Sequence, residues 1–198
     1  MLPENIIYIG VLVNFIGIFY YIRTIFSSGT KPNLISWFIW MLAPFVGVFL
    51  QLKAGAGLSV LPVFMAGFGP LLVIIFSLFK KNVFWKVTKL DMLCGAFSLF
   101  ALVLYVFTSN FGISILFAIL SDGLAAIPTI VKSWKFPETE SGSTYFSGMF
   151  SNILALLIIR NWVFTIYSFN IYFVLVNLII VFAIYRKRIF KLKVAQSN

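Results

Sequence analysis

Asp122 is an acidic residue in the middle of an apolar segment that spans residues 113–134. A carboxylate at the centre of a membrane-spanning helix costs about 2.5–3.5 kcal/mol on the insertion scale, so such residues face the protein interior and mark the path of an ion or a solute. Burial also disfavours the charged form of a carboxyl, which would let Asp122 carry a coupled proton. The opposing interpretation is a protonated or hydrogen-bonded aspartate that fastens two helices together. Asp122 is therefore the first candidate for binding a substrate, with its structural interpretation left open.

Small and polar residues share one face of this segment, because they recur at helical spacing: Asp122, Ala125, Thr129 and Ser133. A comparable face of the first apolar segment carries Asn14, at a depth similar to that of Asp122. We expect Asn14 and Thr129 to contribute to the same substrate-binding site. Close helix packing through small residues accounts for both faces equally well.

Three further residues are candidates for contact with a solute: Trp40, Asn152 and Asn177. Asn152 lies nearest the middle of its apolar segment, and a neutral amide donates and accepts hydrogen bonds without the cost of a charge. Such amides also join helices to one another, for about 0.6 kcal/mol on average. Trp40 lies one turn inside its segment and is placed to stack on a ring. We expect the remaining segment-end tryptophans at the membrane interface: Trp37, Trp134 and Trp162.

Two basic residues, Arg23 and Lys132, lie at matching ends of two apolar segments. One interpretation makes them a cytoplasmic gate that closes against Glu138 or Glu140. The other is that they only fix the orientation of the chain and bind anionic lipid headgroups at the cytoplasmic face.

The composition argues against several classes of protein. The chain has no histidine and a single cysteine, Cys94, so we expect no disulfide, no Cys/His metal site and no Ser-His or Cys-His nucleophile. Asp122 is the one acid deep in an apolar segment, so an intramembrane pair of aspartates has no second member. We therefore expect no enzyme activity, no metal and no cofactor.

Apolar residues dominate the sequence and predict an all-α membrane protein. Hydrophobic residues make up 62% of the 198 residues and charged residues 10%, whereas water-soluble domains are nearer 45–50% and 25%. Windows of about 20 apolar residues, enough to cross a bilayer, can be placed seven times: about 5–26, 34–52, 57–79, 90–108, 113–134, 144–159 and 163–185.

The basic residues predict the orientation in the cell membrane. Two of the fifteen, Lys53 and Arg160, lie on one side of the predicted spans. By the positive-inside rule the side with the other thirteen is cytoplasmic, so the N-terminus is outside and the C-terminus inside. This placement also explains the net charge of +10 without a nucleic-acid partner. The thirteen are Arg23, Lys31, Lys80, Lys81, Lys86, Lys89, Lys132, Lys135, Arg186, Lys187, Arg188, Lys191 and Lys193.

Seven spans divide into three, one and three, with the same orientation in the first and last three. An offset of 109 residues aligns Arg23 with Lys132 and Thr30 with Thr139. We therefore predict two parallel three-helix repeats joined by a linker helix. The parts are residues 1–79 for the first bundle, 80–112 for the linker loop and inversion helix, 113–185 for the second bundle and 186–198 for a basic cytoplasmic tail.

With these features the chain resembles the SWEET and PQ-loop superfamily of seven-helix transporters. The resemblance covers nearly the whole chain, to about Arg188, and its clearest segment is Ile-Pro-Thr-Ile-Val-Lys-Ser-Trp at 127–134. This segment is similar to the Pro-Gln-x-x-Lys helix end of the family, with Thr129 in place of the glutamine. The resemblance implies the three-one-three fold and makes Pro128 and Pro44 the matching hinge positions.

The predicted function is a membrane transporter or facilitator of a small polar solute. Alternating access would come from rocking the two three-helix bundles around Asp122, with or without a coupled proton. The alternative is a seven-helix membrane receptor, sensor or scaffold protein that does not transport. A vitamin-precursor carrier stays open within the first class, and so does assembly into a homo-oligomer.

Overall fold

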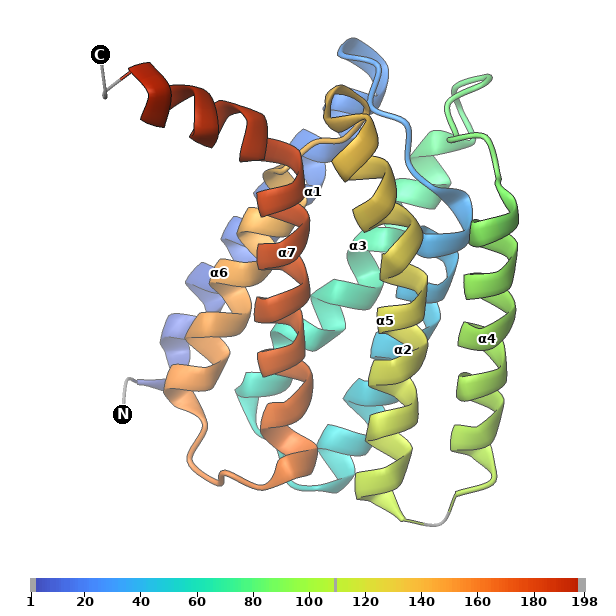
Figure 1. Cartoon of the computed structure of the whole chain (residues 1–198). Helices are drawn as coiled ribbons and strands as arrows, with labels where there is room; N and C mark the ends of the chain where they lie inside the picture. Colours follow the sequence, from blue (N-terminus) through green and yellow to red (C-terminus); the bar gives the residue numbers. More distant parts are fainter. Residues whose placement is uncertain (1–2, 109, 196–198) are drawn as a thin grey trace.

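The computed structural model describes residues 3–108 and 110–195, and these form a bundle of helices without strands (Figure 1). The bundle confirms the prediction of an all-α protein with seven α-helices. The α-helices are α1 (Ile7–Ser27), α2 (Leu34–Lys53), α3 (Leu61–Ser77), α4 (Lys89–Val106), α5 (Phe111–Lys135), α6 (Ser143–Ile158) and α7 (Phe164–Ala195). Three short 3-10 helices accompany them: η1 (Glu4–Ile6), η2 (Leu58–Val60) and η3 (Pro137–Thr139).

Local sequence signals set the helix boundaries. The side chain of Asn33 accepts hydrogen bonds from the main-chain nitrogens of Ile35 (3.1 Å) and Ser36 (3.3 Å), and so caps α2. Asn110 caps α5 in the same way. Gly29, in the turn after α1, has a φ of +77°, a backbone conformation that glycine adopts without strain.

The last helix is longer than the sequence analysis predicted. The expected span ended at Tyr185, but α7, which is 32 residues long, continues to Ala195. Residues 186–195 contain neither glycine nor proline, so nothing in the local sequence stops the helix. Figure 1 shows this C-terminal part of α7 leaving the bundle.

The helices are compatible with a membrane protein. Five of them, counted over the described residues, are long and apolar enough to cross a bilayer, and α6, with 16 residues, is a shorter apolar helix. Large apolar side chains such as Phe19 (66% exposed) and Phe79 (78% exposed) cover the outside. A soluble monomer rarely exposes a surface of this kind.

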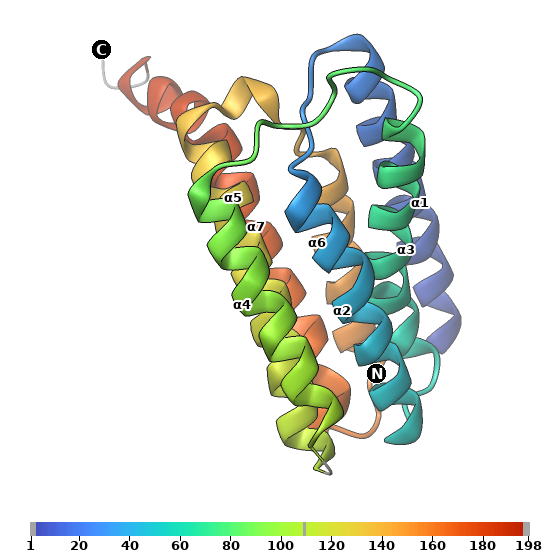
Figure 2. The same ribbon diagram turned by 90° about the vertical axis from the view of Figure 1, so that its right-hand side faces the viewer.

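Two helices, α3 and α7, each pack against two other helices. Helix α3 packs against both α1 and α2, and α7 packs against both α5 and α6. Between these groups, α1 lies along α6 and α2 lies along α5. Helix α4 lies outside, packed along α5 and touching α2 more lightly (Figure 2).

The bundle has two distinct ends. Figure 1 places the connections 28–33, 78–88 and 136–142 and the C-terminus at one end, which we call the basic end. The opposite end holds the N-terminus and the connections after α2, α4 and α6. The segments that carry the thirteen basic residues lie toward the basic end, whereas Lys53 ends α2 and Arg160 belongs to the connection after α6, both segments of the opposite end.

The contact between α1 and α6 depends on small residues. A Cβ atom at Gly17 would lie 2.0 Å from the hydroxyl oxygen of Ser147, and one at Gly10 would lie 3.1 Å from that of Ser151. Glycine at these two positions lets the backbones approach closely, as is common between helices in membranes.

Candidate functional site

A cavity of about 60 Å³ lies in the centre of the bundle, and its mostly apolar wall carries several polar groups. This volume has room for a few water molecules. Helices α1, α2, α3, α5, α6 and α7 all contribute to its wall. Five of the residues that the sequence predicted to bind substrate line it together: Asn14, Trp40, Asp122, Asn152 and Asn177.

Asp122 is 1% exposed and presents one carboxylate oxygen without a partner. The hydroxyl of Tyr172 donates a hydrogen bond of 2.7 Å to its Oδ2, and Trp40 Nε1 donates one of 3.2 Å to its main-chain oxygen. Its Oδ1 has no hydrogen-bond partner in the part of the chain that the structure describes. Buried polar atoms in proteins are nearly always satisfied, so this oxygen is suited to accept a hydrogen bond from water or a solute.

Three amides supply further hydrogen-bonding groups. Asn152 donates from Nδ2 to the main-chain oxygen of Gly148 at 2.8 Å, and its Oδ1 has no partner among the described residues. The amides of Asn14 and Asn177 converge near Gly148, since a Cβ atom there would lie 3.9 Å and 3.2 Å from their nitrogens. Because glycine has no side chain, Gly148 leaves space for the amides of Asn14 and Asn177 in this part of the wall.

Aromatic rings form much of the remaining wall: Trp37, Trp40, Tyr145 and Phe173. The ring centroids of Trp37 and Trp40 are 5.6 Å apart and those of Trp40 and Tyr145 are 6.2 Å apart, both in edge-to-face arrangements. Trp37 Nε1 and the hydroxyl of Tyr145 are buried without a hydrogen-bond partner among residues 3–108 and 110–195. The wall therefore combines aromatic faces with unpaired polar atoms.

Trp37 was expected at the membrane interface, and this prediction is wrong. Its side chain is 1% exposed and lines the cavity. Its position near a helix end misled the sequence analysis. The spacing of three residues from Trp40 places both on one face of α2 and was the available signal.

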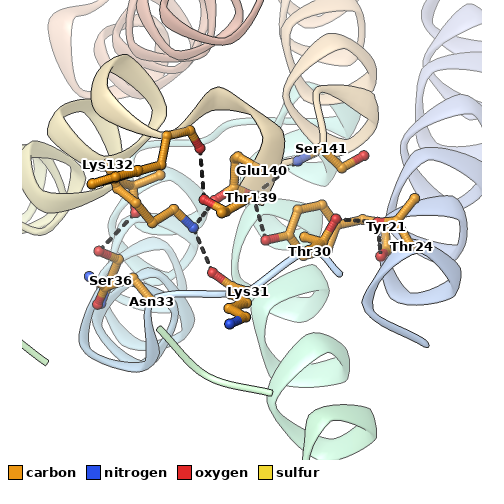
Figure 3. A network of polar contacts seen from close by, with 12 residues as sticks. Tyr21, Thr24, Thr30, Lys31, Asn33, Ser36, Lys132, Thr139, Glu140 and Ser141 are labelled. Carbon is orange, nitrogen blue, oxygen red and sulfur yellow. Dashed lines mark hydrogen bonds and ion pairs between the residues drawn. The ribbon is translucent and has the colours of Figure 1, made fainter. Parts of the chain in front are cut away.

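A buried ionic cluster, which we call the inner cluster, joins the end of α5 to the connections before α2 and α6 and to α1 (Figure 3). Lys132 Nζ lies 2.5 Å from Glu140 Oε2 and donates a hydrogen bond of 2.6 Å to the main-chain oxygen of Lys31. The hydroxyl of Tyr21 donates a 2.5 Å hydrogen bond to Glu140 Oε1. The ring of Tyr21 also packs on Trp37, 4.8 Å between centroids, which connects the cluster to the cavity wall. The inner cluster consists of the side chains of Tyr21, Lys132 and Glu140 and the main-chain oxygen of Lys31.

The other candidate residues belong neither to the inner cluster nor to the cavity wall. Arg23 is exposed and is not part of the inner cluster, and Glu138 is exposed as well. Thr129 is fully buried and does not line the cavity. Its hydroxyl donates a hydrogen bond of 3.0 Å to Ser36 and so joins α5 to α2. Pro44 and Pro128 lie inside α2 and α5.

Contacts between α2 and α7 lie toward the opposite end. The buried side chain of Gln51 donates a hydrogen bond of 2.9 Å to the main-chain oxygen of Ile166. The ring of Phe169 packs against Gly47, where a Cβ atom would lie 2.5 Å from the ring. An exposed ion pair between Arg160 and Glu4, 3.0 Å long, lies at the surface of this end.

The described residues contain no group of three His, Cys, Asp or Glu side chains that could hold a metal ion. Comparison of the chain with family models, curated proteins and solved structures finds no significant match. The fold and the cavity thus define a membrane-compatible helical protein with a buried polar site, and the function has to be argued from that site.

Proposed function

We propose that this protein is a membrane transporter or facilitator of a small polar solute. The observation that carries the proposal is Asp122, which lines the central cavity and has one carboxylate oxygen without a hydrogen-bond partner among the described residues. A buried polar atom left unpaired costs about 1–3 kcal/mol. Water or a solute that reaches Asp122 removes this cost. Intramembrane acids are rare and mark such paths.

The arrangement that we propose is two three-helix units joined by α4. The neighbours observed in the bundle support this: exchanging α1, α2 and α3 for α5, α6 and α7 reproduces the same contacts. The order α1–α3–α2 corresponds to α5–α7–α6, and the contact of α1 with α6 corresponds to that of α5 with α2. A site between two such units is the arrangement expected of a transporter built from parallel repeats.

Rocking of the two units would expose the cavity to one side at a time. At the basic end the units are held together by the inner cluster and by the hydrogen bond between Thr129 and Ser36. Toward the opposite end they are held by Gln51 and by the contact of Phe169 with Gly47. The units also share the contact of α1 with α6, which includes an apolar cluster of Ile7 with Leu154, and rocking would have to loosen this contact as well. The cavity volume of about 60 Å³ fits a closed state, because ligand pockets for drug-sized molecules are about 300–1,000 Å³.

The basic end is the cytoplasmic end in this proposal, because Lys and Arg gather on the cytoplasmic side of membrane proteins. All seven helices then cross the bilayer, with the N-terminus outside. The inner cluster is the cytoplasmic gate, formed by Lys132 with Glu140 and without Arg23.

The chemistry of the cavity favours a solute with hydrogen-bond donors, and cations in particular. Asp122 is the one charged side chain among the described residues that line the cavity. Aromatic faces attract cations, and four aromatic residues line the same cavity as Asp122. A cation would therefore meet both a carboxylate and the negative faces of aromatic rings.

Uptake into proteoliposomes tests the proposal. The probes are radiolabelled guanidinium, urea and a set of small polyols, each with and without a pH gradient. Guanidinium and urea are both small and planar, but guanidinium is permanently charged. We expect saturable uptake of guanidinium that exceeds uptake of urea and that Asp122→Asn abolishes. Glu138→Gln removes the same charge from an exposed position and should leave uptake unchanged.

The outcomes separate the parts of the proposal. Uptake of polyols without guanidinium would keep transport and reject the cation preference. Saturable binding without uptake of any solute would favour a receptor. Uptake that depends on an inward proton gradient and is uncoupled by Asp122→Asn would assign the proton to Asp122.

A further inference from the structure

A second, apolar groove lies on the outside of the bundle between α2 and α4. Its volume is about 500 Å³. Two turns of each helix line it: Leu34, Ile35, Phe38 and Ile39 from α2, and Met92, Gly95, Ala96 and Leu99 from α4. None of these eight described side chains is polar, so water is a poor occupant of the groove.

Small residues on α4 create the groove. A Cβ atom at Gly95 would lie 2.7 Å from Ile35, so the absence of a side chain at Gly95 lets α4 approach α2 closely. Ala96 is exposed and its short side chain leaves the adjoining space empty. Larger side chains on either side, Met92 and Leu99, form the wall.

The groove starts at the basic end, where the first turns of α2 and α4 are fixed side by side. The side-chain nitrogen of Asn33 donates a hydrogen bond of 2.7 Å to Asp91 Oδ1, and the main-chain nitrogen of Thr88 also donates to the carboxylate of Asp91. Asp91 is 3% exposed. The acid of this region is therefore turned inward and bound, and it does not offset positive charge at the surface.

Two exposed lysines precede the first groove-lining residues of α2 and α4 in the sequence. Lys89 lies three residues before Met92 and so shares its helical face, one turn nearer to the end of the bundle. Lys31 lies three residues before Leu34, on the α2 side. Both side chains are exposed. An apolar groove that starts at an end of the bundle with exposed lysines is complementary to a molecule with one anionic group and a long apolar chain.

We propose that the groove between α2 and α4 is a binding site for one anionic phospholipid. An acyl chain lies in the groove along Gly95 and Ala96, and the phosphate lies between Lys31 and Lys89. Lipid recognition of this kind combines apolar burial with attraction of Lys and Arg to anionic headgroups. The site shares no lining residue with the central cavity, so a test of lipid binding does not depend on whether the protein transports a solute.

Lipid retention by the purified full-length protein tests the site. The protein in detergent receives phosphatidylglycerol or phosphatidylcholine with identical chains, and native mass spectrometry counts the lipids retained. We expect preferential retention of one phosphatidylglycerol. Lys31→Ala with Lys89→Ala should reduce that preference about tenfold or more. A control pair, Lys81→Ala with Lys187→Ala, removes the same charge at the same end and should keep it.

A second variant tests the chain-binding part of the groove. Ala96→Trp fills the groove and should reduce retention of both lipids, whereas Leu93→Trp, on an exposed position of the same helix, should not. If Ala96→Trp does not fold, phosphatidylglycerol with a photoreactive acyl chain is applied to the wild-type protein. We then expect cross-links within residues 34–39 and 92–99.

Three results would overturn the inference. The first is an unchanged preference for phosphatidylglycerol after loss of Lys31 and Lys89. The second is cross-linking elsewhere on the bundle. The third is a groove covered by a second copy of the chain, seen as a dimer that retains no lipid.

Discussion

The ammonium nitrogen of Lys132 lies 2.5 Å from a carboxylate oxygen of Glu140, and both side chains are buried. The pair joins the end of α5 to the connection before α6. Through Tyr21 and the carbonyl oxygen of Lys31 it also holds α1 and the connection before α2. One buried ion pair thus ties together four segments between the cavity and the basic end.

Removal of one partner of this pair should destabilise the protein strongly. Lys132→Met leaves the carboxylate of Glu140 buried without its cation, and such changes cost about 3–5 kcal/mol. The double variant Lys132→Met with Glu140→Gln should recover part of this loss. The free energy of unfolding in detergent measures the effect. Arg160→Met is the matched control, because its exposed pair with Glu4 should contribute less than about 1 kcal/mol. Equal effects of Lys132→Met and Arg160→Met would contradict the role of the inner cluster.

Tyr172→Phe should destabilise the protein through Asp122. The change removes the hydroxyl that donates to Asp122 Oδ2 at 2.7 Å and leaves a second carboxylate oxygen unpaired. We expect a loss of about 1–3 kcal/mol in the free energy of unfolding. The double variant Tyr172→Phe with Asp122→Asn should lose less than the sum of the two single variants. Strict additivity would show that the hydrogen bond contributes nothing.

Gly17→Ala should disturb the contact of α1 with α6. The added Cβ atom would lie 2.0 Å from the hydroxyl oxygen of Ser147 and 2.9 Å from the main-chain oxygen of Ser143. Overpacking of this kind costs about 1–3 kcal/mol, measured by thermal or denaturant unfolding. Gly57→Ala is the control, because the nearest atom to its Cβ would be 3.9 Å away. A Gly17→Ala protein as stable as Gly57→Ala would place the two helices farther apart than described.

Thr129→Val should affect stability and leave solute affinity unchanged. The hydroxyl of Thr129 hydrogen-bonds to Ser36 and does not line the cavity. Its removal should cost about 1 kcal/mol in unfolding free energy. The half-saturating solute concentration for uptake is the second readout. A shift in that concentration at constant stability would show that Thr129 contacts the solute, as its helical spacing from Asp122 predicted.

Hydropathy and helical spacing predicted much of this structure from the sequence. The seven helices follow from long apolar windows, and five of the substrate-binding candidates do line one cavity. Partners distant in the sequence were beyond such reasoning. Tyr172, which binds Asp122 across 50 residues, and Gln51, which binds Ile166 across 115, carry no local signal. The burial of Trp37 likewise depends on residues of other helices, such as Tyr21 of α1.

Access to the cavity from both faces of the membrane is the most direct test of the central claim. Asn177→Cys places a thiol in the cavity wall, and Cys94→Ala removes the single native cysteine. A membrane-impermeant maleimide is applied to right-side-out and to inside-out vesicles. We expect modification from both faces, with guanidinium slowing both reactions. Modification from one face only, or from neither, would contradict alternating access to Asp122.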